Sequence, residues 1–321
     1  MYDEIMIQEV VENQRKFFRT GKTLNVDFRI AKLKALKAAV LENRQELEKA
    51  LGEDLGRHPL EAYFCDIGSL VLEINETIKG LKRWAKPETH FSGLHCFPSL
   101  VTKVYKMPYG VSLIISPFNF PIILSLGVLT ASIAGGNTAV IKVSSKSPSC
   151  SAITKKIISK TFFPEYVTVI GGGHDVADMC LRQRFDKIFY TGSPRVGVHV
   201  LEEAAKNLTP TALELGGETG NWCIIRKDAD LKDAARKVAF FKILNSGQIC
   251  INEVCLHMMV KGVPFNGVGH SGMGAYHGKW GFMEFTHPQT VLIGSSRFNL
   301  SMREHPYNMG WKRTMINFFE K

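Results

Sequence analysis

The chain has 321 residues, enough for two domains of ordinary size, and its content of 45% hydrophobic and 22% charged residues excludes a disordered or collagen-like chain. The net charge is +10, which by itself would allow nucleic-acid binding. The lysines and arginines are scattered, however, with no zinc-knuckle spacing and no aromatic residues between basic ones, so we expect no nucleic-acid partner.

Helical periodicity dominates the first quarter of the chain, residues 4–86. Apolar residues recur at helical spacing between lysines and arginines over 31–41, and the pattern continues over 61–84. A proline ends this region. Apolar and polar residues then alternate over 101–106, which predicts a strand with one face in solvent.

From Gly110 onward, short apolar stretches alternate with helical ones. The expected strands are 111–115, 138–142, 167–170, 187–190 and 211–215, and the expected helices are 121–133, 148–160, 174–182 and 194–206. This alternation is typical of βαβ units, so we expect an α/β fold with a parallel sheet between two layers of helices. Ligands bind beyond the carboxyl ends of such strands. Farther along, we expect a helix at 230–244, a strand at 286–293 and an amphipathic tail.

The cysteines and the apolar stretches indicate the compartment. Seven cysteines at irregular spacing, with no CxxC, favour a reducing, cytoplasmic setting over a disulfide framework. His270 and His277 share a segment but lack further ligands, so we expect no metal. The uncharged run between Lys106 and Lys142 is broken by prolines, which leaves an apolar stretch too short to span a membrane.

Two residues have side chains suited to covalent and acid–base chemistry. Cys250 stands in a Gly-Gln-Ile-Cys turn after an expected helix, where it is either a thiolate nucleophile or a small buried apolar residue. Glu214 ends an expected strand just before two glycines, where it is either a general base or a salt-bridged surface carboxylate.

Three further positions suit ligand binding. Asn119 lies between two phenylalanines and two prolines, where its amide needs a partner or acts as a donor. Lys142 closes a buried strand, within reach of a nucleotide's hydroxyl groups. The turn from Tyr190 to Ser193 joins a strand to a helix, and its backbone N–H groups suit a phosphate.

In chain order, these segments resemble the motif series of the aldehyde dehydrogenase superfamily. The matching segments are Pro117-Phe118-Asn119-Phe120-Pro121, Ile141-Lys142, Tyr190-Thr191-Gly192-Ser193, Leu213-Glu214-Leu215-Gly216-Gly217 and Gly247-Gln248-Ile249-Cys250. The stretch 264–279 resembles the C-terminal signature of class 3, the fatty or aromatic aldehyde dehydrogenases. The resemblance covers nearly all of the chain.

The resemblance implies a parallel Rossmann-type cofactor sheet with N-terminal helices, a catalytic domain and a bridging β-ribbon. The expected parts are N-terminal helices at 1–86, a bridging segment at 87–109, a dinucleotide-binding domain at 110–213, a truncated catalytic domain at 214–285, and a bridging strand with the tail at 286–321. It also implies an aldehyde substrate, NAD or NADP as cofactor, and a homodimer.

The family mechanism assigns roles to residues of this sequence. Cys250 attacks the aldehyde, the Asn119 amide and the Cys250 N–H hold the oxyanion, and Glu214 activates the hydrolytic water. For the cofactor, the resemblance implies that Lys142 binds the adenosine ribose, Ser193 the pyrophosphate, and Thr191 and Gly192 the nicotinamide. Ser145, Leu215 and Gly216 complete the expected cofactor contacts.

The sequence also departs from the family pattern. Only 264 − 250 = 14 positions separate Cys250 from Pro264, where the family has a long stretch of catalytic domain that includes a glutamate for the nicotinamide ribose. Ser145 replaces the carboxylate that would repel a 2′-phosphate, so we expect NADP to bind at least as well as NAD. Glu218 and Asn266 replace a lysine and a glycine of the motifs.

Two hypotheses follow. In the first, the chain is a working dehydrogenase that tolerates the missing stretch. In the second, it is a catalytically impaired internal-deletion derivative that serves as a nucleotide-binding remnant or a dimer partner. For either, we expect 101–107 to pair with 286–293 as a ribbon, and we expect Cys250 to keep its neighbours but lose its enclosure.

Overall fold

The structure is a computed structural model that describes residues 2–93, 96, 99–216, 230, 247–248, 256–294 and 310. The chain divides into two compact units, residues 1–85 with 107–287, and residues 86–106 with 288–321. Neither unit is continuous in sequence, because the expected bridging segments leave the first unit and return to it. The division into cofactor and catalytic domains stays a prediction.

The N-terminal region is helical, as expected. Its elements are α1 (Glu4–Arg19), η1 (Lys22–Leu24), α2 (Val26–Glu42), α3 (Arg44–Leu55), α4 (Pro59–Ala62), η2 (Tyr63–Gly68) and α5 (Ser69–Trp84). Side chains set the starts of two helices, since Asp3 caps α1 and Asn25 caps α2 by accepting a backbone N–H. Glycine in the left-handed conformation ends α3 at Gly56.

The expected βα units follow in the expected order. They are β3 (Val111–Ile115), η4 (Ile123–Gly127), α6 (Val128–Gly135), β4 (Thr138–Lys142), α7 (Pro148–Thr161), β5 (Val167–Ile170), α8 (His174–Leu181), β6 (Lys187–Gly192), α9 (Pro194–Ala205) and β7 (Thr211–Leu215). The prediction for 121–133 was wrong in one respect, because this helix begins as the π-helix η4. The Ser125 hydroxyl, which donates to the carbonyl of Pro121, accompanies the wider turn.

In the described part of the chain, the main sheet has the strand order β5-β4-β3-β6-β7-β9. The strands from β5 to β7 are parallel, which confirms the predicted α/β fold. The sequence did not predict β9 (Gly272–Met273), which pairs antiparallel with β7 at the edge. A Cβ on Gly272 would lie 1.9 Å from the Leu213 carbonyl oxygen, so this pairing requires glycine.

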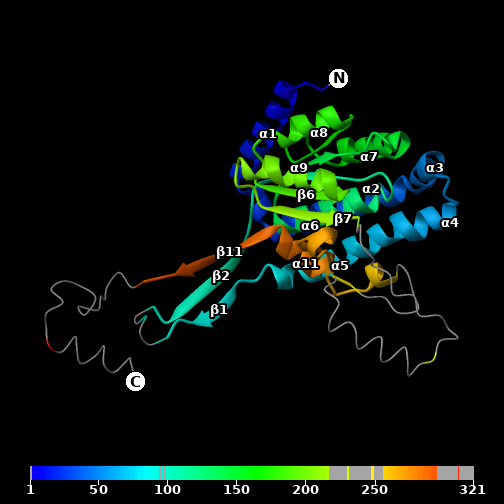
Figure 1. The fold of residues 1–321 in the computed structure, drawn as a ribbon. Coiled ribbons are helices and arrows are strands. Elements are labelled where there is room, and N and C mark those ends of the chain that lie inside the picture. Colours follow the sequence, from blue (N-terminus) through cyan, green and yellow to red (C-terminus); the bar gives the residue numbers. More distant parts are fainter. Residues whose placement is uncertain are drawn as a thin grey trace. The chain divides into compact units, whose positions relative to one another are not determined.

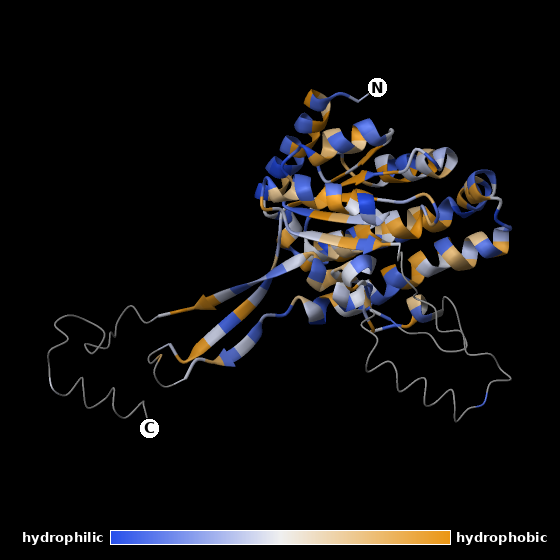
Figure 2. Cartoon of the chain, in the orientation of Figure 1, coloured by the Kyte–Doolittle hydropathy of each residue, from blue (hydrophilic) through white to orange (hydrophobic). Residues whose placement is uncertain are grey.

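Helices cover both faces of the sheet, each over its own apolar core. One core contains side chains of α1, α8 and α9, and the other contains side chains of α2, α3, α5, α6, α7 and α11 (Gly278–Glu284). Figure 1 shows α8 and α9 on one side of β6 and β7, with α6 and α11 on the other. Figure 2 shows the apolar strands between these layers. The glycine-rich stretch adds η6 (Leu256–Met259), β8 (Phe265–Asn266), η7 (Gly269–Ser271) and β10 (Ala275–Tyr276).

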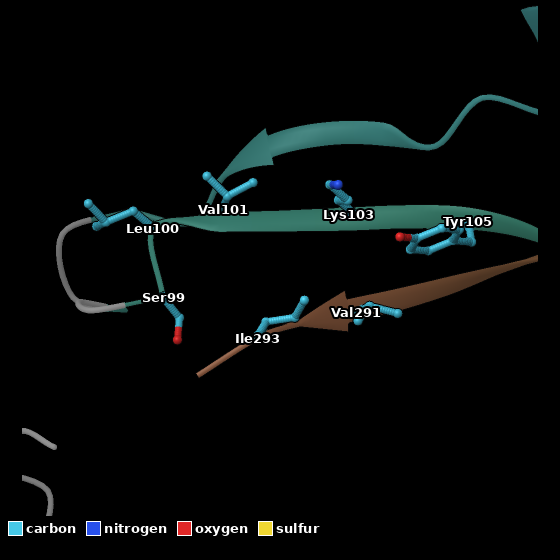
Figure 3. Close-up of a pocket in the computed structure, with 7 residues that line it drawn as sticks. All are labelled: Ser99, Leu100, Val101, Lys103, Tyr105, Val291 and Ile293. Atoms are coloured by element: carbon cyan, nitrogen blue, oxygen red, sulfur yellow. The ribbon is translucent and has the colours of Figure 1, made fainter. Parts of the chain in front are cut away.

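The second unit contains a small sheet with the strand order β1-β2-β11, formed by β1 (Glu88–Phe91), β2 (Val101–Pro108) and β11 (Thr286–Leu292). The neighbouring positions of β2 and β11 confirm the predicted pairing of 101–107 with 286–293. Figure 3 shows a surface hollow on this unit, lined by Ser99, Leu100, Val101, Lys103, Tyr105, Val291 and Ile293. The predicted helix at 230–244 and the tail lie outside the described residues, apart from Asp230 and Gly310.

Candidate functional site

The carboxyl edge of the parallel sheet brings several predicted site residues together. β4 ends at Lys142, β6 ends at Gly192, and β7 ends at Leu215, one residue after Glu214. Thr191 lies opposite Glu214 in the register of β6 and β7. Thr191 and Glu214 are 23 positions apart in the sequence, and the parallel pairing of β6 and β7 makes them neighbours.

The two faces of this edge carry different groups. Phe189 and Ala212 belong to the core under α5, α6 and α11, so Thr191 and Glu214, two residues farther along, point toward that face. Val140 belongs to the opposite core, and Lys142 therefore points toward α8. A ligand that contacts all three side chains must cross the edge of the sheet.

Glu214 is a buried carboxylate that forms no ion pair with any described residue. It is 7% exposed, and among the described residues its Oε1 has no hydrogen-bond partner. Burial raises the pKa of Glu214 to about 9, and repulsion by Glu284 adds to the rise. The hydroxyl of Thr191 is likewise buried without a partner in the described chain. Unsatisfied buried polar atoms are rare, and here two of them face the same space.

Lys142 is almost as buried, with 5% of its surface exposed. Its ammonium donates to the Val143 carbonyl at 2.9 Å. Burial lowers the pKa of Lys142, and the nearby Cys180 and Asp175 counteract part of this effect. An ammonium has three donors, so Lys142 keeps the capacity to bind hydroxyl groups of a ligand.

The strand-to-helix turn after β6 has the geometry of an anion site. Ser193 caps α9 and accepts from the N–H of Val196 at 3.4 Å, and Pro194 occupies the first turn. A Cβ on Gly192 would lie 2.1 Å from the Tyr190 hydroxyl, so a larger residue at this position would have to displace the Tyr190 side chain. Pro194 has no N–H, and the N–H groups of Val196 and Gly197 donate to Ser193, so the N–H of Arg195 is the first-turn donor left to suit a pyrophosphate.

Three other predicted cofactor residues border this turn or the end of β4. Leu215 closes β7 and is partly buried, while Gly216 is exposed and donates its N–H to the Gly192 carbonyl at 3.0 Å. Ser145 is exposed in the loop after β4, beside the exposed Lys146.

These residues fit a dinucleotide. A buried lysine at the end of β4, a capped helix start after Gly192, and a threonine hydroxyl without a partner among the described residues lie along one edge of the sheet. In the described ranges, no group of three or more His, Cys, Asp or Glu side chains could hold a metal ion.

Asn119 is exposed in the loop that follows β3. Its backbone carbonyl accepts from Arg57 at 2.8 Å, which ties the loop to α4 and its flanking turn. Cys250 lies outside the described residues, so its distance to Asn119 and Glu214 stays a prediction. Gln248, two residues earlier, donates to the Asn266 carbonyl on β8 at 3.5 Å.

Sequence reasoning missed a polar pair that joins the glycine-rich stretch to α5. His277 has φ of 80°, and its Nδ1 lies 3.1 Å from Oε2 of Glu73 on α5. The N–H of Gly278 donates to the same carboxylate at 2.8 Å. His277 could have drawn attention because it lies within a signature stretch. Glu73 could not, because the sequence shows it only as one of several polar residues of an amphipathic helix. The tertiary fold alone pairs them.

Comparison with known proteins defines the class of this fold and site. Residues 2–256 match the model of the aldehyde dehydrogenase family, and the chain belongs to that family. It is similar to aldehyde dehydrogenase family 3 comG of Dictyostelium discoideum, 40% identical over 243 residues that make up 75% of this chain and 51% of the relative. This relative is of the predicted class 3 type.

The dimeric, NADP-preferring aldehyde dehydrogenase of Canis lupus familiaris is also similar, 36% identical over 252 residues, 76% of this chain and 53% of the relative. A structure of the substrate-bound state of Staphylococcus aureus AldH matches with a TM-score of 0.88 and 26% identity, covering 100% of both chains. The chain spans about half the length of the curated relatives it matches in sequence. No helix within the described ranges is long and apolar enough to cross a membrane.

Proposed function

We propose that this chain is an NAD(P)-dependent aldehyde dehydrogenase, which oxidises an aldehyde to a carboxylic acid through Cys250. The observation that carries the proposal is the buried carboxylate of Glu214, opposite Thr191 at the carboxyl edge of the sheet, whose Oε1 has no hydrogen-bond partner among the described residues. A carboxylate in that position suits a general base better than a structural ion pair.

The reaction proceeds in two halves on the protein. The Cys250 thiolate attacks the aldehyde carbon, and the Asn119 amide with the Cys250 N–H stabilises the resulting oxyanion. The bound dinucleotide supplies the acceptor for the hydride that leaves this carbon. Glu214 then removes a proton from water, the water oxygen attacks the thioester carbon, and the carbon–sulfur bond breaks to release the acid.

The cofactor assignment rests on the edge residues. Lys142 binds the adenosine ribose, Ser193 and the start of α9 bind the pyrophosphate, and Thr191 and Gly192 contact the nicotinamide. Ser145 admits NADP beside NAD. The relative from Canis lupus familiaris is named as NADP-preferring, which agrees with a site that accepts NADP.

The class 3 resemblance points to a long-chain or aromatic aldehyde as substrate and to a role in cellular aldehyde metabolism. We place the protein in the cytoplasm, since seven cysteines at irregular spacing suit a reducing compartment. We also propose that it forms a homodimer.

A second function is favoured by the short separation of Cys250 and Pro264. In this alternative, the chain is a catalytically impaired derivative that binds nucleotide or a partner subunit. Residues 251–263 are too few to form a second layered domain that would enclose the thiol. Water would then compete for the oxyanion donors and weaken their effect.

The test measures NAD(P)H formation from a long-chain and an aromatic aldehyde, with Cys250→Ser as the control. Cys250-dependent turnover supports the dehydrogenase. Slow or absent turnover supports the derivative if a small alkylating reagent still labels Cys250 rapidly. Peptide mapping separates this label from Cys180, where burial raises the thiol pKa to about 12. An inert Cys250 would contradict the loss of enclosure.

A further inference from the structure

A buried ion pair outside the sheet edge contacts the loop that carries Asn119. Asp66 in η2 is fully buried and forms an ion pair with Arg57. Its other oxygen, Oδ1, accepts from the N–H groups of Ile122 at 3.2 Å and Ile123 at 2.8 Å. One carboxylate therefore binds the C-terminal end of the Asn119 loop.

Arg57 binds the other part of the same loop. Its Nη2 donates to the Asn119 carbonyl at 2.8 Å, and its guanidinium lies 4.5 Å from the centre of the Phe120 ring. The planar guanidinium has donors on two sides, so it reaches Asp66 and Asn119 at once. Lysine, with a single nitrogen, cannot reproduce this geometry.

The backbone around the pair is unusual. Asp66 lies in the π-helix η2, and the N–H groups that it binds lie at the start of a second π-helix, η4. Short π-helical turns are rare and are found frequently at functional sites. A buried ion pair is also weak evidence for stability, because an apolar pair of similar volume would often stabilise as well. What the pair provides is a defined loop geometry.

We propose that Arg57 and Asp66 are positioning residues, which hold the backbone of residues 119–123 so that the Asn119 amide faces the reacting carbonyl. This inference rests on the proposed function, in which Asn119 stabilises the oxyanion. Neither residue contacts the substrate; both act through Asn119. A displacement of the amide by a fraction of an ångström is enough to lower the rate of the chemical step.

The kinetic test is a double-mutant cycle. We expect Arg57→Lys and Asp66→Asn each to lower kcat by about 10- to 100-fold, with the KM for the dinucleotide changed less than about twofold. In an Asn119→Ala background, either substitution should lower kcat by less than about threefold, because the group that it positions is gone. Equal losses with and without the Asn119 amide would overturn the proposal.

The matched control is Asp186→Asn. Asp186 also pairs with an arginine, Arg15 at 2.8 Å, and accepts a backbone N–H, from Val111 at 2.8 Å, but it contacts no part of the Asn119 loop. It should lower the unfolding temperature and leave kcat within about twofold. A kcat loss as large as that of Asp66→Asn would assign the effect to stability and overturn the proposal.

A second measurement is independent of turnover. Hydrogen exchange of amides 119–127 should be at least about tenfold faster in Arg57→Lys, while β3 and β4 exchange as in the parent chain. If the parent chain oxidises no aldehyde and the loop still responds, the proposed function fails and the positioning of the loop stands. Unchanged exchange in this loop would overturn the positioning role itself.

Discussion

At the residue scale, the environment of Glu214 decides both its chemistry and its effect on stability. A carboxylate at 7% exposure is poorly solvated, and Glu284 repels its charge, so the folded chain favours the protonated acid. A general base must be ionised. The same burial that excludes water from Glu214 therefore shifts the ionisation of this proposed base toward alkaline pH.

The first prediction concerns Glu214→Gln. The folded-state pKa is about 9 and the ordinary value is 4.5, so the unfolded chain releases a proton between these values and the folded chain does not. The contribution of Glu214 to stability is therefore most favourable below pH 4.5 and is lost as the pH rises toward 9. Glutamine removes this effect, and we expect about 1–3 kcal/mol of added stability at pH 7–8.

Urea unfolding at pH 4 and pH 8 measures this difference. The exposed Glu165→Gln serves as the control and should change stability little at either pH. In the parent chain, kcat should rise with pH through an alkaline midpoint, since only ionised Glu214 activates water. A stability gain that is the same at pH 4 and pH 8 would contradict the raised pKa.

The second prediction concerns Ser145→Glu. An added carboxylate beside the adenosine ribose would repel a 2′-phosphate but accept a bond from a 2′-hydroxyl. We expect the Kd for NADP to rise by about tenfold or more, with the Kd for NAD changed less than about threefold. Titration with both dinucleotides tests this. Lys146→Gln is a comparison variant, which should weaken the binding of NADP because it removes a positive charge. A parent chain that binds NAD much more tightly than NADP would contradict the idea.

At the element scale, β9 closes the edge of the sheet beside Glu214. It pairs Gly272 with Glu214 and Met273 with Leu213. Without this short strand, the outer edge of β7 would present free backbone groups. The glycine-rich segment is therefore part of the first compact unit, and it gives Glu214 part of its burial.

The third prediction tests this contact with Gly272→Ala. The added Cβ would lie 1.9 Å from the Leu213 carbonyl oxygen, and φ is 121°, so either β9 separates from β7 or the backbone shifts. We expect a loss of about 2–4 kcal/mol and greater exposure of Glu214. Gly262→Ala is the matched control, with a φ of 79° but no described atom near the added Cβ. Equal losses in both variants would argue against the β9 contact.

The start of α9 and the pairing of the strands hold the proposed cofactor residues in place, although the segment between Cys250 and Pro264 is short. The residues that bind the dinucleotide in our proposal lie on β4, β6 and α9, which the cores on both faces of the sheet hold in place. The nucleophile turn belongs to the part of the sequence beside the missing stretch. If the proposed function holds, we therefore expect this chain to bind the nucleotide even where turnover is lost.

At the scale of the whole molecule, the small sheet of the second unit has apolar side chains in solvent. Phe91 and Ile293 are 69% and 73% exposed. Among the described residues, the outer strands β1 and β11 have no further strand partner, and exposed strand edges are commonly covered by pairing with another strand.

The fourth prediction is that this unit joins a second copy of the chain as a homodimer. Light scattering should give twice the chain mass at micromolar concentration, and Leu292→Lys on β11 should shift the protein toward the monomer by charge on the strand edge. An exposed lysine substitution on the first unit, Leu208→Lys, is the control and should leave the dimer intact. A strictly monomeric parent chain at high concentration would contradict the prediction.

Much of the fold could be predicted from local patterns. The helical periodicity of 4–84 and the apolar stretches of β3 to β7 are patterns that neighbouring residues set. All of these elements lie within a few residues of the expected bounds. Local sequence determined them because hydrogen bonding and side-chain direction repeat over short distances. Family motifs then identified the residues at the carboxyl edge.

Three features were decided by tertiary structure alone. β9 depends on a close approach that Gly272 permits, the π-helix η4 begins where Asp66 binds its backbone, and His277 meets Glu73 204 positions away. None of these contacts has a periodic signature, because each depends on where distant segments meet. The sequence by itself determined the α/β scaffold through local chemistry, and it indicated the carboxyl edge of the sheet as the ligand site. Only the packed chain determined the burial of Glu214, and hence its raised pKa, because burial depends on every element around the residue.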